Sequence, residues 1–406
     1  MTEGLHLAIA LDGAGWHPAA WRAPDARPTE LFRGRYWRDL VKQAEWGGID
    51  FVTIEDALGL QTSDFGEPRV DPSEVQGRLD ALLIASSVAP STRRIGLVPT
   101  VTTTHTEPFH VSTAIATLDH ISGGRAGWRP QVSGRPHEAA HFGRRVIPPF
   151  DPANQDAASA EVLQSLFDEA ADSVEVVRAL WDSWQDDAEI RDVATGRFID
   201  RTRLHRVAFR GDQFSVLGPS ITPRSPQGQP LVTVLAHQTV PYRLAAAQAD
   251  IVYITPHDDA QVTSIIGEVR AAEEYVNRAG EPLRIWADLI IALDSGTQSG
   301  WTRLTELNEL HGHTLRSDAT ILAGSAREIA DHLAAWRGLG IDGFRLRPLT
   351  LPRDLVLITD DLVPLLASRG LLATDDDATT LRGRLGLPPA RNRYVDEPSG
   401  ALVSAS

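Results

Sequence analysis

The chain of 406 residues contains no cysteine, which excludes disulfide bonds, thiolate metal sites and a cysteine nucleophile. Such a composition is consistent with a reducing cytoplasm, so we expect a cytoplasmic protein. No apolar run reaches the roughly 18 residues that a membrane-spanning helix needs. No basic region precedes the apolar segment 5–11, so a secretory signal peptide is not expected.

The chain also lacks any block rich in lysine or arginine, and its formal net charge is -15 at pH 7. Such a protein repels the phosphates of nucleic acid unless a local basic face exists. We therefore expect neither nucleic acid nor a membrane as a partner and interpret the acidity as a solubility feature. A hydrophobic content of 42% is enough for a large buried core.

Strand-like and helix-like segments alternate along most of the chain. The expected strands are short apolar runs at residues 5–11, 51–54, 94–101, 125–132, 231–236, 251–254, 283–293 and 343–347. The expected helices lie at residues 33–46, 78–89, 108–121, 161–184, 242–249, 261–278 and 326–339. About eight alternations favour an α/β fold of the TIM-like (β/α)8 barrel type. A doubly wound open sheet is the alternative, but no glycine-rich fingerprint follows the first strand.

We interpret residues 1–406 as a single barrel domain with two additions. Residues 185–229 carry turn residues and short strand-like pieces, which predict an insertion over one barrel end. Residues 371–406 form a C-terminal extension whose last few residues are expected to be poorly ordered.

The segment from the third expected strand to the fourth is typical of a barrel active site. A threonine-rich turn follows the strand, a helix begins at Pro108, and Gly123 and Gly124 end it. Barrel enzymes place their chemistry where a strand feeds a helix. Thr100, Thr102 and Thr103 are therefore candidate ligand-binding residues, although threonine also simply suits strands.

Two histidines are candidate catalytic residues. His17 follows the first strand, where it lines a pocket or is packed between neighbouring tryptophans. His110 lies in the first turns of the third helix, and a neutral imidazole can donate or accept a proton. The pair His311 and His313 could suggest metal binding, but two histidines alone are weak evidence for a site, so we expect none.

Two charged residues at strand ends are further candidates. Asp56 follows the second strand, where it either lies beside a ligand or caps the following turn. Arg129 lies at the mouth of the fourth strand, and an arginine inside a barrel needs an anionic partner. That partner is Glu55, Asp56 or a ligand.

Several motifs occur in one order along nearly the whole chain. They include Gly15-Trp-His-Pro-Ala-Ala-Trp-Arg22, the segment 113–128, Ala179-Leu-Trp-Asp-Ser-Trp184, Ser225-Pro-Gln-Gly228 and Asp342-Gly-Phe344. With these motifs the chain resembles the bacterial-luciferase-like flavin monooxygenases. The resemblance is to the branch that contains nitrilotriacetate, dibenzothiophene-sulfone and long-chain alkane monooxygenases.

The resemblance implies a TIM-like barrel that binds reduced FMN delivered by a separate NAD(P)H-dependent flavin reductase. It implies activation of dioxygen and oxygenation of a small organic substrate, with sulfur- or nitrogen-bearing compounds as candidates. It also implies a homodimer or homotetramer. The residues expected near the flavin are Asp56, Thr100, Thr102, Thr103, Arg129 and Thr239, with His17 and His110 as catalytic residues.

This sequence departs from the family's pattern at the flavin-binding positions. Arg129 stands where the family typically has asparagine, and Leu166 and Phe167 align with an arginine–tyrosine pair that helps to bind the FMN phosphate. The loop 236–242 replaces a loop rich in glycine and serine. Each lost charge-assisted hydrogen bond costs roughly 1.5 to 3 kcal/mol, so weaker FMN binding is expected.

Two alternatives follow from these departures. In one, the chain is a flavin-free, catalytically silent barrel subunit of a heteromeric oxygenase. In the other, it is an oxidoreductase that uses another cofactor, such as a deazaflavin. An open phosphate site near His237 and Arg129 would favour the enzyme, whereas filling of the cavity by Phe167 and Tyr242 would favour the silent subunit.

Overall fold

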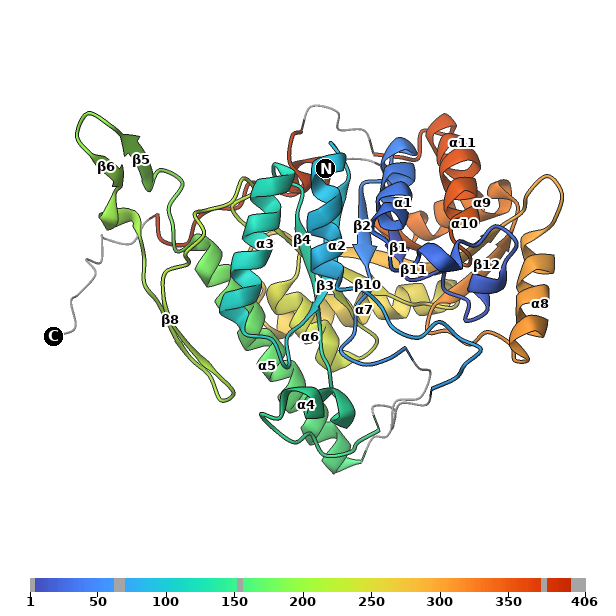
Figure 1. The fold of residues 1–406 in the computed structure, drawn as a ribbon, viewed down its shortest axis with the longest axis horizontal. Coiled ribbons are helices and arrows are strands. Elements are labelled where there is room, and N and C mark those ends of the chain that lie inside the picture. The colour runs from blue at the N-terminus through green and yellow to red at the C-terminus, as the bar shows by residue number, and fades with distance from the viewer. Residues whose placement is uncertain (1–3, 62–69, 152–155, 374–377, 396–406) are drawn as a thin grey trace.

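Eight parallel strands form a closed barrel in the computed structural model, which describes residues 4–61, 70–151, 156–373 and 378–395 (Figure 1). Around the barrel the strand order is β1-β2-β3-β4-β9-β10-β11-β13, and β13 pairs with β1 to close it. The strands are β1 His6–Leu11, β2 Phe51–Ile54, β3 Gly96–Thr102, β4 Gly127–Gln131, β9 Leu231–Leu235, β10 Ile251–Ile254, β11 Arg284–Leu293 and β13 Gly343–Pro348. All eight correspond to expected strands, so the barrel prediction is confirmed.

Helices surround the barrel, as Figure 1 shows. Those at expected positions are α1 Gly34–Trp46, α2 Ala81–Val88, α3 Pro108–Ser122, α5 Ala157–Asp182, α6 Thr239–Gln248, α7 Asp259–Tyr275 and α9 Ala326–Gly338. Helix α3 begins and ends at the residues that the sequence predicted. Pro108 occupies the first turn, and Gly123 ends the helix at a φ of 67°, which glycine adopts without strain. Within the described residues, no helix has the length and apolar character needed to cross a membrane.

Further elements were not expected from the sequence. They are helices α4 Pro136–Phe142, α8 Gly300–His311, α10 Arg353–Leu357 and α11 Val363–Ser368, and the strand β12 Thr320–Gly324. Strand β12 pairs only with the C-terminal half of β11, outside the closed barrel. The chain between α8 and β12 thereby runs over the C-terminal end of the barrel, where it contributes to the site described below.

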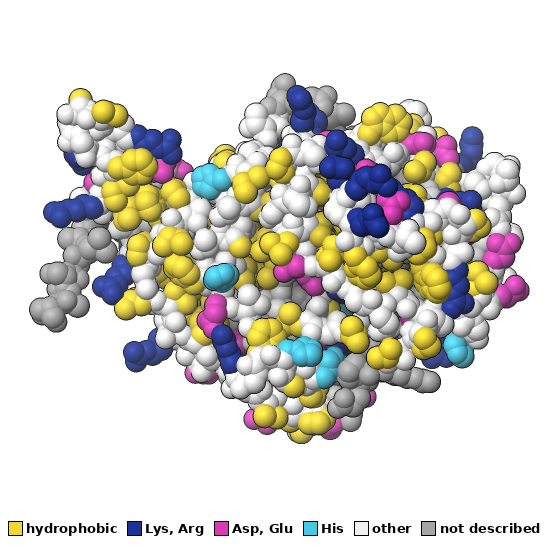
Figure 2. Space-filling model, viewed as in Figure 1, with side chains coloured by type: hydrophobic (Ala, Val, Ile, Leu, Met, Phe, Trp, Pro, Cys, Tyr) yellow, Lys and Arg dark blue, Asp and Glu magenta, His cyan; other side chains and the backbone are white. Residues whose placement is uncertain are grey.

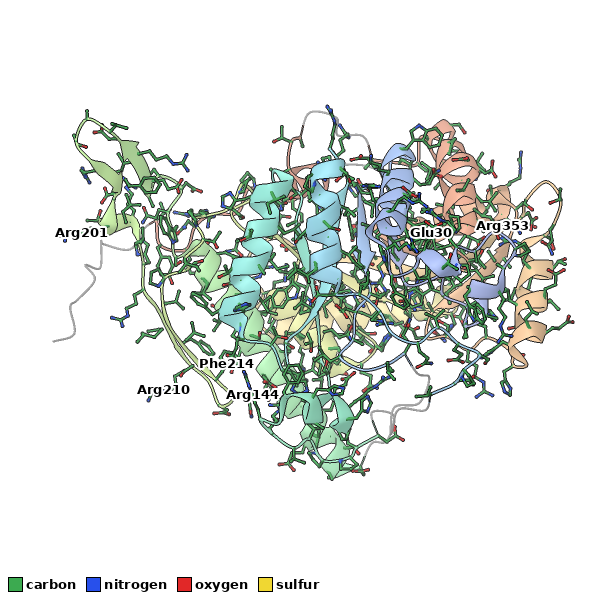
Figure 3. All side chains as sticks on the ribbon, viewed as in Figure 1. Glu30, Arg144, Arg201, Arg210, Phe214 and Arg353 are labelled. Carbon is green, nitrogen blue, oxygen red and sulfur yellow. The ribbon has the colours of Figure 1, made fainter. Side chains whose placement is uncertain are left out.

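Two antiparallel hairpins occupy much of the segment 185–229. Strands β5 Glu189–Asp192 and β6 Arg197–Ile199 form the first, and β7 Val207–Arg210 and β8 Ser215–Gly218 form the second. The first hairpin extends away from the barrel, whereas the second packs along the outer side of α5 through Val207 and Phe209. Figure 3 labels Arg201 near the first hairpin and Arg210 and Phe214 on the second.

The N-terminal end of the barrel is closed by apolar packing. Helix α12, Leu381–Arg384, brings Leu381 into a buried cluster with Phe51, Val98 and Trp286. A β-carbon at Gly96 would lie 2.7 Å from both Leu381 and Phe51, so this strand position must be glycine for the extension to pack. The opposite, C-terminal end remains available for a ligand.

Candidate functional site

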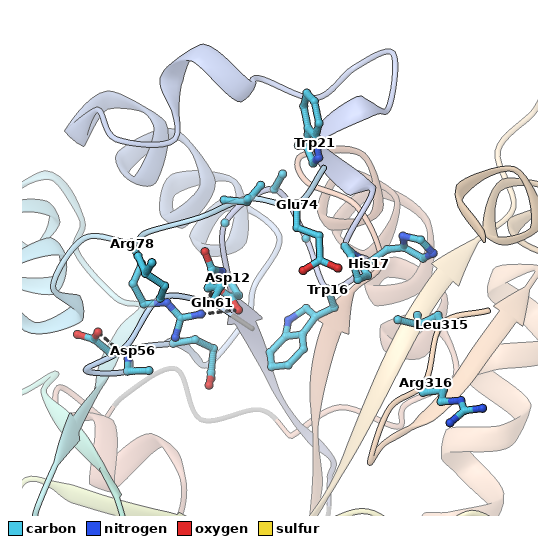
Figure 4. Close-up of a pocket in the computed structure, with 18 of the residues that line it drawn as sticks. Asp12, Trp16, His17, Trp21, Asp56, Gln61, Glu74, Arg78, Leu315 and Arg316 are labelled. Carbon is cyan, nitrogen blue, oxygen red and sulfur yellow. Dashed lines mark hydrogen bonds and ion pairs between the residues drawn. The ribbon is translucent and has the colours of Figure 1, made fainter. Parts of the chain in front are cut away.

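A large cavity lies over the C-terminal end of the barrel. It has a volume of about 960 Å³, and Figure 4 shows residues that line it, including Trp16, His17 and Arg78. A second cavity of about 360 Å³ shares Trp16 and Glu55 with the first, so the two adjoin. Small-molecule and cofactor sites typically occupy roughly 300–1,000 Å³. The volume therefore suits a cofactor together with a small substrate.

A network of buried ion pairs forms the floor of this cavity. Strand β13 directs Arg345 and Arg347 to the same side because alternate residues of a strand share a face. Arg345 lies directly beside Asp288 in the register of β11 and β13, and its Nε donates to the Asp288 carboxylate at 2.6 Å. Arg347 bonds to Asp288 as well, and its Nη1 donates to Asp318 at 2.7 Å.

Arg129 extends the network across the barrel. Its Nη2 donates to Glu55, and its Nε donates to the Thr100 hydroxyl at 3.1 Å. Glu55 also accepts a hydrogen bond of 3.2 Å from Arg345. Burial alone would raise the pKa of Glu55, but Arg129 and Arg345 outweigh it and lower the pKa to about 2. Glu55 is therefore ionised, and of the two carboxylates considered from sequence it is the one that pairs with Arg129.

His17 is held in one orientation at the edge of the larger cavity, with 2% of its surface exposed. The Ala19 amide donates to its Nδ1 at 3.0 Å, so Nε2 carries the proton and donates to Asn308 Oδ1 at 3.2 Å. Burial is the main cause that lowers the pKa of His17 to about 4. His17 is thus a neutral imidazole at pH 7, with both nitrogens engaged by the protein.

Asp56 caps a helix as well as lining the cavity. Its two oxygens accept hydrogen bonds from the amides of Ala57 and Ala81, at 2.7 and 2.8 Å, and Ala81 is the first residue of α2. Burial is the main cause that raises the pKa of Asp56 to about 6. Because Asp56 also lines the cavity, both roles considered from sequence are compatible with its position.

Most of the other predicted residues lie around a small adjoining pocket of about 210 Å³, lined by Asp56, Thr100, Thr102 and the exposed His110. Thr102 exchanges a 2.7 Å hydrogen bond with Ser133. Thr103 is not among the lining residues; its hydroxyl donates to the backbone oxygen of Gln131 at 3.2 Å. The two candidate histidines are therefore separated, because His17 lines the large cavity and His110 the small pocket.

The N-terminus of α6 lies near the 360 Å³ cavity, whose lining includes His237, two residues before the helix, and Leu244 within it. Gln238 provides no side-chain cap, and Thr239 is the exposed first residue of the helix. The first amides of a helix lack intrahelical partners and attract anions, although Pro241 contributes no N–H. An uncapped helix N-terminus of this kind is compatible with a phosphate group, although it offers fewer donors than a loop rich in glycine and serine.

The two aromatic residues considered as plugs do not fill the cavity. Tyr242 is 2% exposed, and its side chain is not among those that line the 360 Å³ cavity. Phe167 forms a wall of that cavity. Leu166 lies away from it, buried against Ala139 and Ile147.

Sequence reasoning missed the charged partners on the floor of the cavity. Arg345 and Arg347 alternate with apolar residues within β13, and Asp288 interrupts the apolar strand β11. The sequence did contain a signal for these residues, namely charged residues at positions of the strands that are expected to face the inside of the barrel. Asp12 was missed as well; it pairs with Arg78 at 3.3 Å in the 960 Å³ cavity (Figure 4).

The profile of the family described as "Luciferase-like monooxygenase" matches residues 15–343. The chain belongs to this family. It is 27% identical to N-acetyl-S-(2-succino)cysteine monooxygenase of Bacillus subtilis (strain 168), over 96% of this chain and 98% of the relative. It is 26% identical to nitrilotriacetate monooxygenase component A of Aminobacter aminovorans, over 98% and 99%.

A solved structure of riboflavin lyase with modified FMN and riboflavin has the same fold as this luciferase-like protein. The TM-score is 0.80 at 24% identity, over 95% of this chain and 96% of the other. The resemblance inferred from the motifs is therefore confirmed. Family membership and these relatives also support the assignment of the chain as an oxidoreductase.

Proposed function

We propose that the protein is the oxygenating component of a two-component monooxygenase. In this proposal it takes reduced FMN from an NAD(P)H-dependent flavin reductase and uses O2 to oxygenate a small organic substrate. The observation that carries the proposal is the pair of adjoining cavities at the C-terminal end of the barrel, with the uncapped N-terminus of α6 near the smaller one.

The relatives support this assignment by their names. The nitrilotriacetate enzyme is described as component A of its system, and the riboflavin lyase structure holds a modified FMN. FMN would supply the activation of O2, in which one oxygen atom enters the substrate and the other leaves as water. The protein would bind and orient the two partners and exclude bulk water.

Individual residues have separate roles in the proposal. The first amides of α6 and the Thr239 hydroxyl bind the phosphate. Thr100, Thr102, Thr103 and Asp56 line or support the adjoining walls. His17 and His110 are the candidate catalytic residues, since an imidazole ring can donate or accept a proton. For His17 this role requires Nε2 to exchange its hydrogen bond with Asn308 for one to a ligand. We also propose a cytoplasmic homodimer or homotetramer.

The deciding experiment is an anaerobic titration of the purified protein with reduced FMN, followed by rapid mixing with O2. We expect saturable binding in the micromolar range and a transient absorbing species distinct from both reduced and oxidised flavin. Absence of binding up to millimolar reduced FMN would reject the proposal. It would favour the silent-subunit or deazaflavin alternative.

A further inference from the structure

Arg129 is only partly used by the protein. The side chain is 6% exposed, yet its hydrogen bonds to Glu55 and Thr100 engage only the Nη2 and Nε atoms. Among the described residues, none accepts a hydrogen bond from Nη1. Arg129 also lines the 360 Å³ cavity. A fixed guanidinium group with spare N–H donors therefore borders the space in which a ligand would lie.

The charge network contains three guanidinium groups and three carboxylates, but its positive members are buried more completely than two of the carboxylates, Glu55 and Asp318. The side chains of Arg129, Arg345 and Arg347 are at most 6% exposed, and those of their partners Glu55 and Asp288 are 10% and 0% exposed. The third carboxylate, Asp318, is 39% exposed, so water screens its charge more effectively. A buried guanidinium group with unused N–H donors favours binding of an anionic group.

We propose, building on the proposed function, that Arg129 binds the negative charge of the reduced flavin ring and makes the site selective for reduced over oxidised FMN. Two electrons and one proton convert the neutral isoalloxazine ring into a monoanion, whose charge is shared by the pyrimidine nitrogen N1 and the adjacent carbonyl oxygen. Both atoms accept hydrogen bonds from a guanidinium group. Protein charges near this part of a flavin tune its electronic properties.

The phosphate group cannot provide this selectivity. It is present in both redox states, so contacts at the N-terminus of α6 stabilise both complexes to a similar extent. A positive charge beside the isoalloxazine ring distinguishes the two states, because the ring is negatively charged only when it is reduced. Selectivity of this kind suits a protein that must capture the reduced form from a solution in which oxidised FMN competes.

The test compares the dissociation constants of oxidised and reduced FMN, measured anaerobically, for the wild type, Arg129→Asn and Arg129→Lys. Loss of one charge-assisted hydrogen bond should weaken binding of reduced FMN by about 10- to 100-fold in Arg129→Asn. Binding of oxidised FMN should change less than about threefold. Arg129→Lys should retain part of the selectivity because the positive charge remains.

A matched control removes one positive charge elsewhere. Arg243 lies on α6, but its guanidinium group packs over the ring of Tyr275 at 3.8 Å, so Arg243→Gln should leave both constants unchanged. The double variant Arg129→Asn/Glu55→Gln removes one charge of each sign, which guards against misfolding from an unpaired Glu55. It should lose the selectivity in the same way as the single variant.

A second readout is the pH at which the bound reduced flavin gains its second proton, followed by absorbance. Arg129 should keep the bound ring anionic to lower pH than in Arg129→Asn. A purely structural arginine would not produce this difference.

The outcomes separate the two proposals. If the wild type binds no reduced FMN, the proposed function fails and this inference fails with it. If the wild type binds reduced FMN but Arg129→Asn weakens both redox states equally, or neither, the inference alone is overturned. In that case Arg129 contacts the phosphate, a substrate carboxylate or the protein only.

Discussion

Buried single residues in this barrel depend on partners that are distant in sequence. Asp288 shows the dependence most clearly, because it is fully buried between Arg345 and Arg347. Nothing in the local pattern around Asp288 identifies those partners; the register of β11 and β13 does. A charged residue within an apolar strand predicts that some partner exists, but which partner depends on tertiary structure.

Replacing this carboxylate should be costly. Asp288→Asn leaves two buried guanidinium groups without their shared anion, and removal of one partner of a buried pair typically costs about 3–5 kcal/mol. The free energy of unfolding, measured with urea, should fall by about that amount. The control is Asp187→Asn, which removes the 63% exposed partner of Arg203 and should cost less than about 1 kcal/mol. Equal effects of the two changes would contradict this account of the network.

His17 should contribute to the dependence of stability on pH. Burial lowers its pKa to about 4 in the folded state from an ordinary value of 6.5, so the unfolded chain binds more protons between these values. The contribution to stability is thus complete above pH 6.5 and is lost as pH falls towards 4. The fall in unfolding free energy between pH 7 and pH 5 should be about 2 kcal/mol smaller in His17→Gln than in the wild type. A fall of the same size in His17→Gln and in the exposed His313→Gln would refute this.

At the scale of elements, the sequence predicted all eight barrel strands because each is a short apolar run buried within the sheet. Strand β12 escaped prediction because most of its residues are only partly buried, and its pairing with β11 lies outside the barrel. Helix α8 buries only Gly300, Arg303, Leu304 and Leu307, which gives a weak apolar pattern. The parts of the site on the loop between α8 and β12, including Asp318, were missed for the same reason.

The packing of α12 against the N-terminal end of the barrel predicts how two glycine substitutions change the free energy of unfolding. Gly96→Ala places a methyl group against Leu381 and Phe51, and such overpacking typically costs about 1–3 kcal/mol. Gly267→Ala, in the interior of α7, meets no atom within 4 Å and should stabilise the protein by about 0.5–1 kcal/mol. Urea denaturation should therefore give changes of opposite sign.

The additional change Leu381→Ala provides the check on this explanation. If contact with α12 causes the cost, Gly96→Ala should destabilise the Leu381→Ala protein less than the wild type. If Gly96→Ala destabilises both proteins equally, the strain arises from contact with Phe51 in the neighbouring strand and not from α12.

At the scale of the whole molecule, the two barrel ends have different roles because the chain covers only one of them with apolar residues. The N-terminal end is sealed by Leu381 and its neighbours, so the open end is the one where charged side chains converge. The sequence predicted this polarity in general terms, since strand ends that feed helices carry the chemistry of barrels. It offered Glu55 as one possible partner of Arg129, but it did not predict the pairs of Asp288 with Arg345 and Arg347, which form only when β11 and β13 meet.

The net charge of -15 makes a final prediction about how an anionic flavin reaches this end. Basic and acidic side chains are interspersed on the face drawn in Figure 2, and the arginines of the cavity floor are paired with carboxylates. The long-range field should therefore repel FMN, whose phosphate carries a negative charge, and salt should screen that repulsion.

We expect the association rate of oxidised FMN, followed by fluorescence quenching, to rise about two- to threefold between 0.02 and 0.2 M salt. Neutral riboflavin is the matched control and should show no such rise. A rate that falls with salt for FMN alone would instead mean that the local field of the α6 N-terminus and the cavity arginines outweighs the charge of the whole molecule.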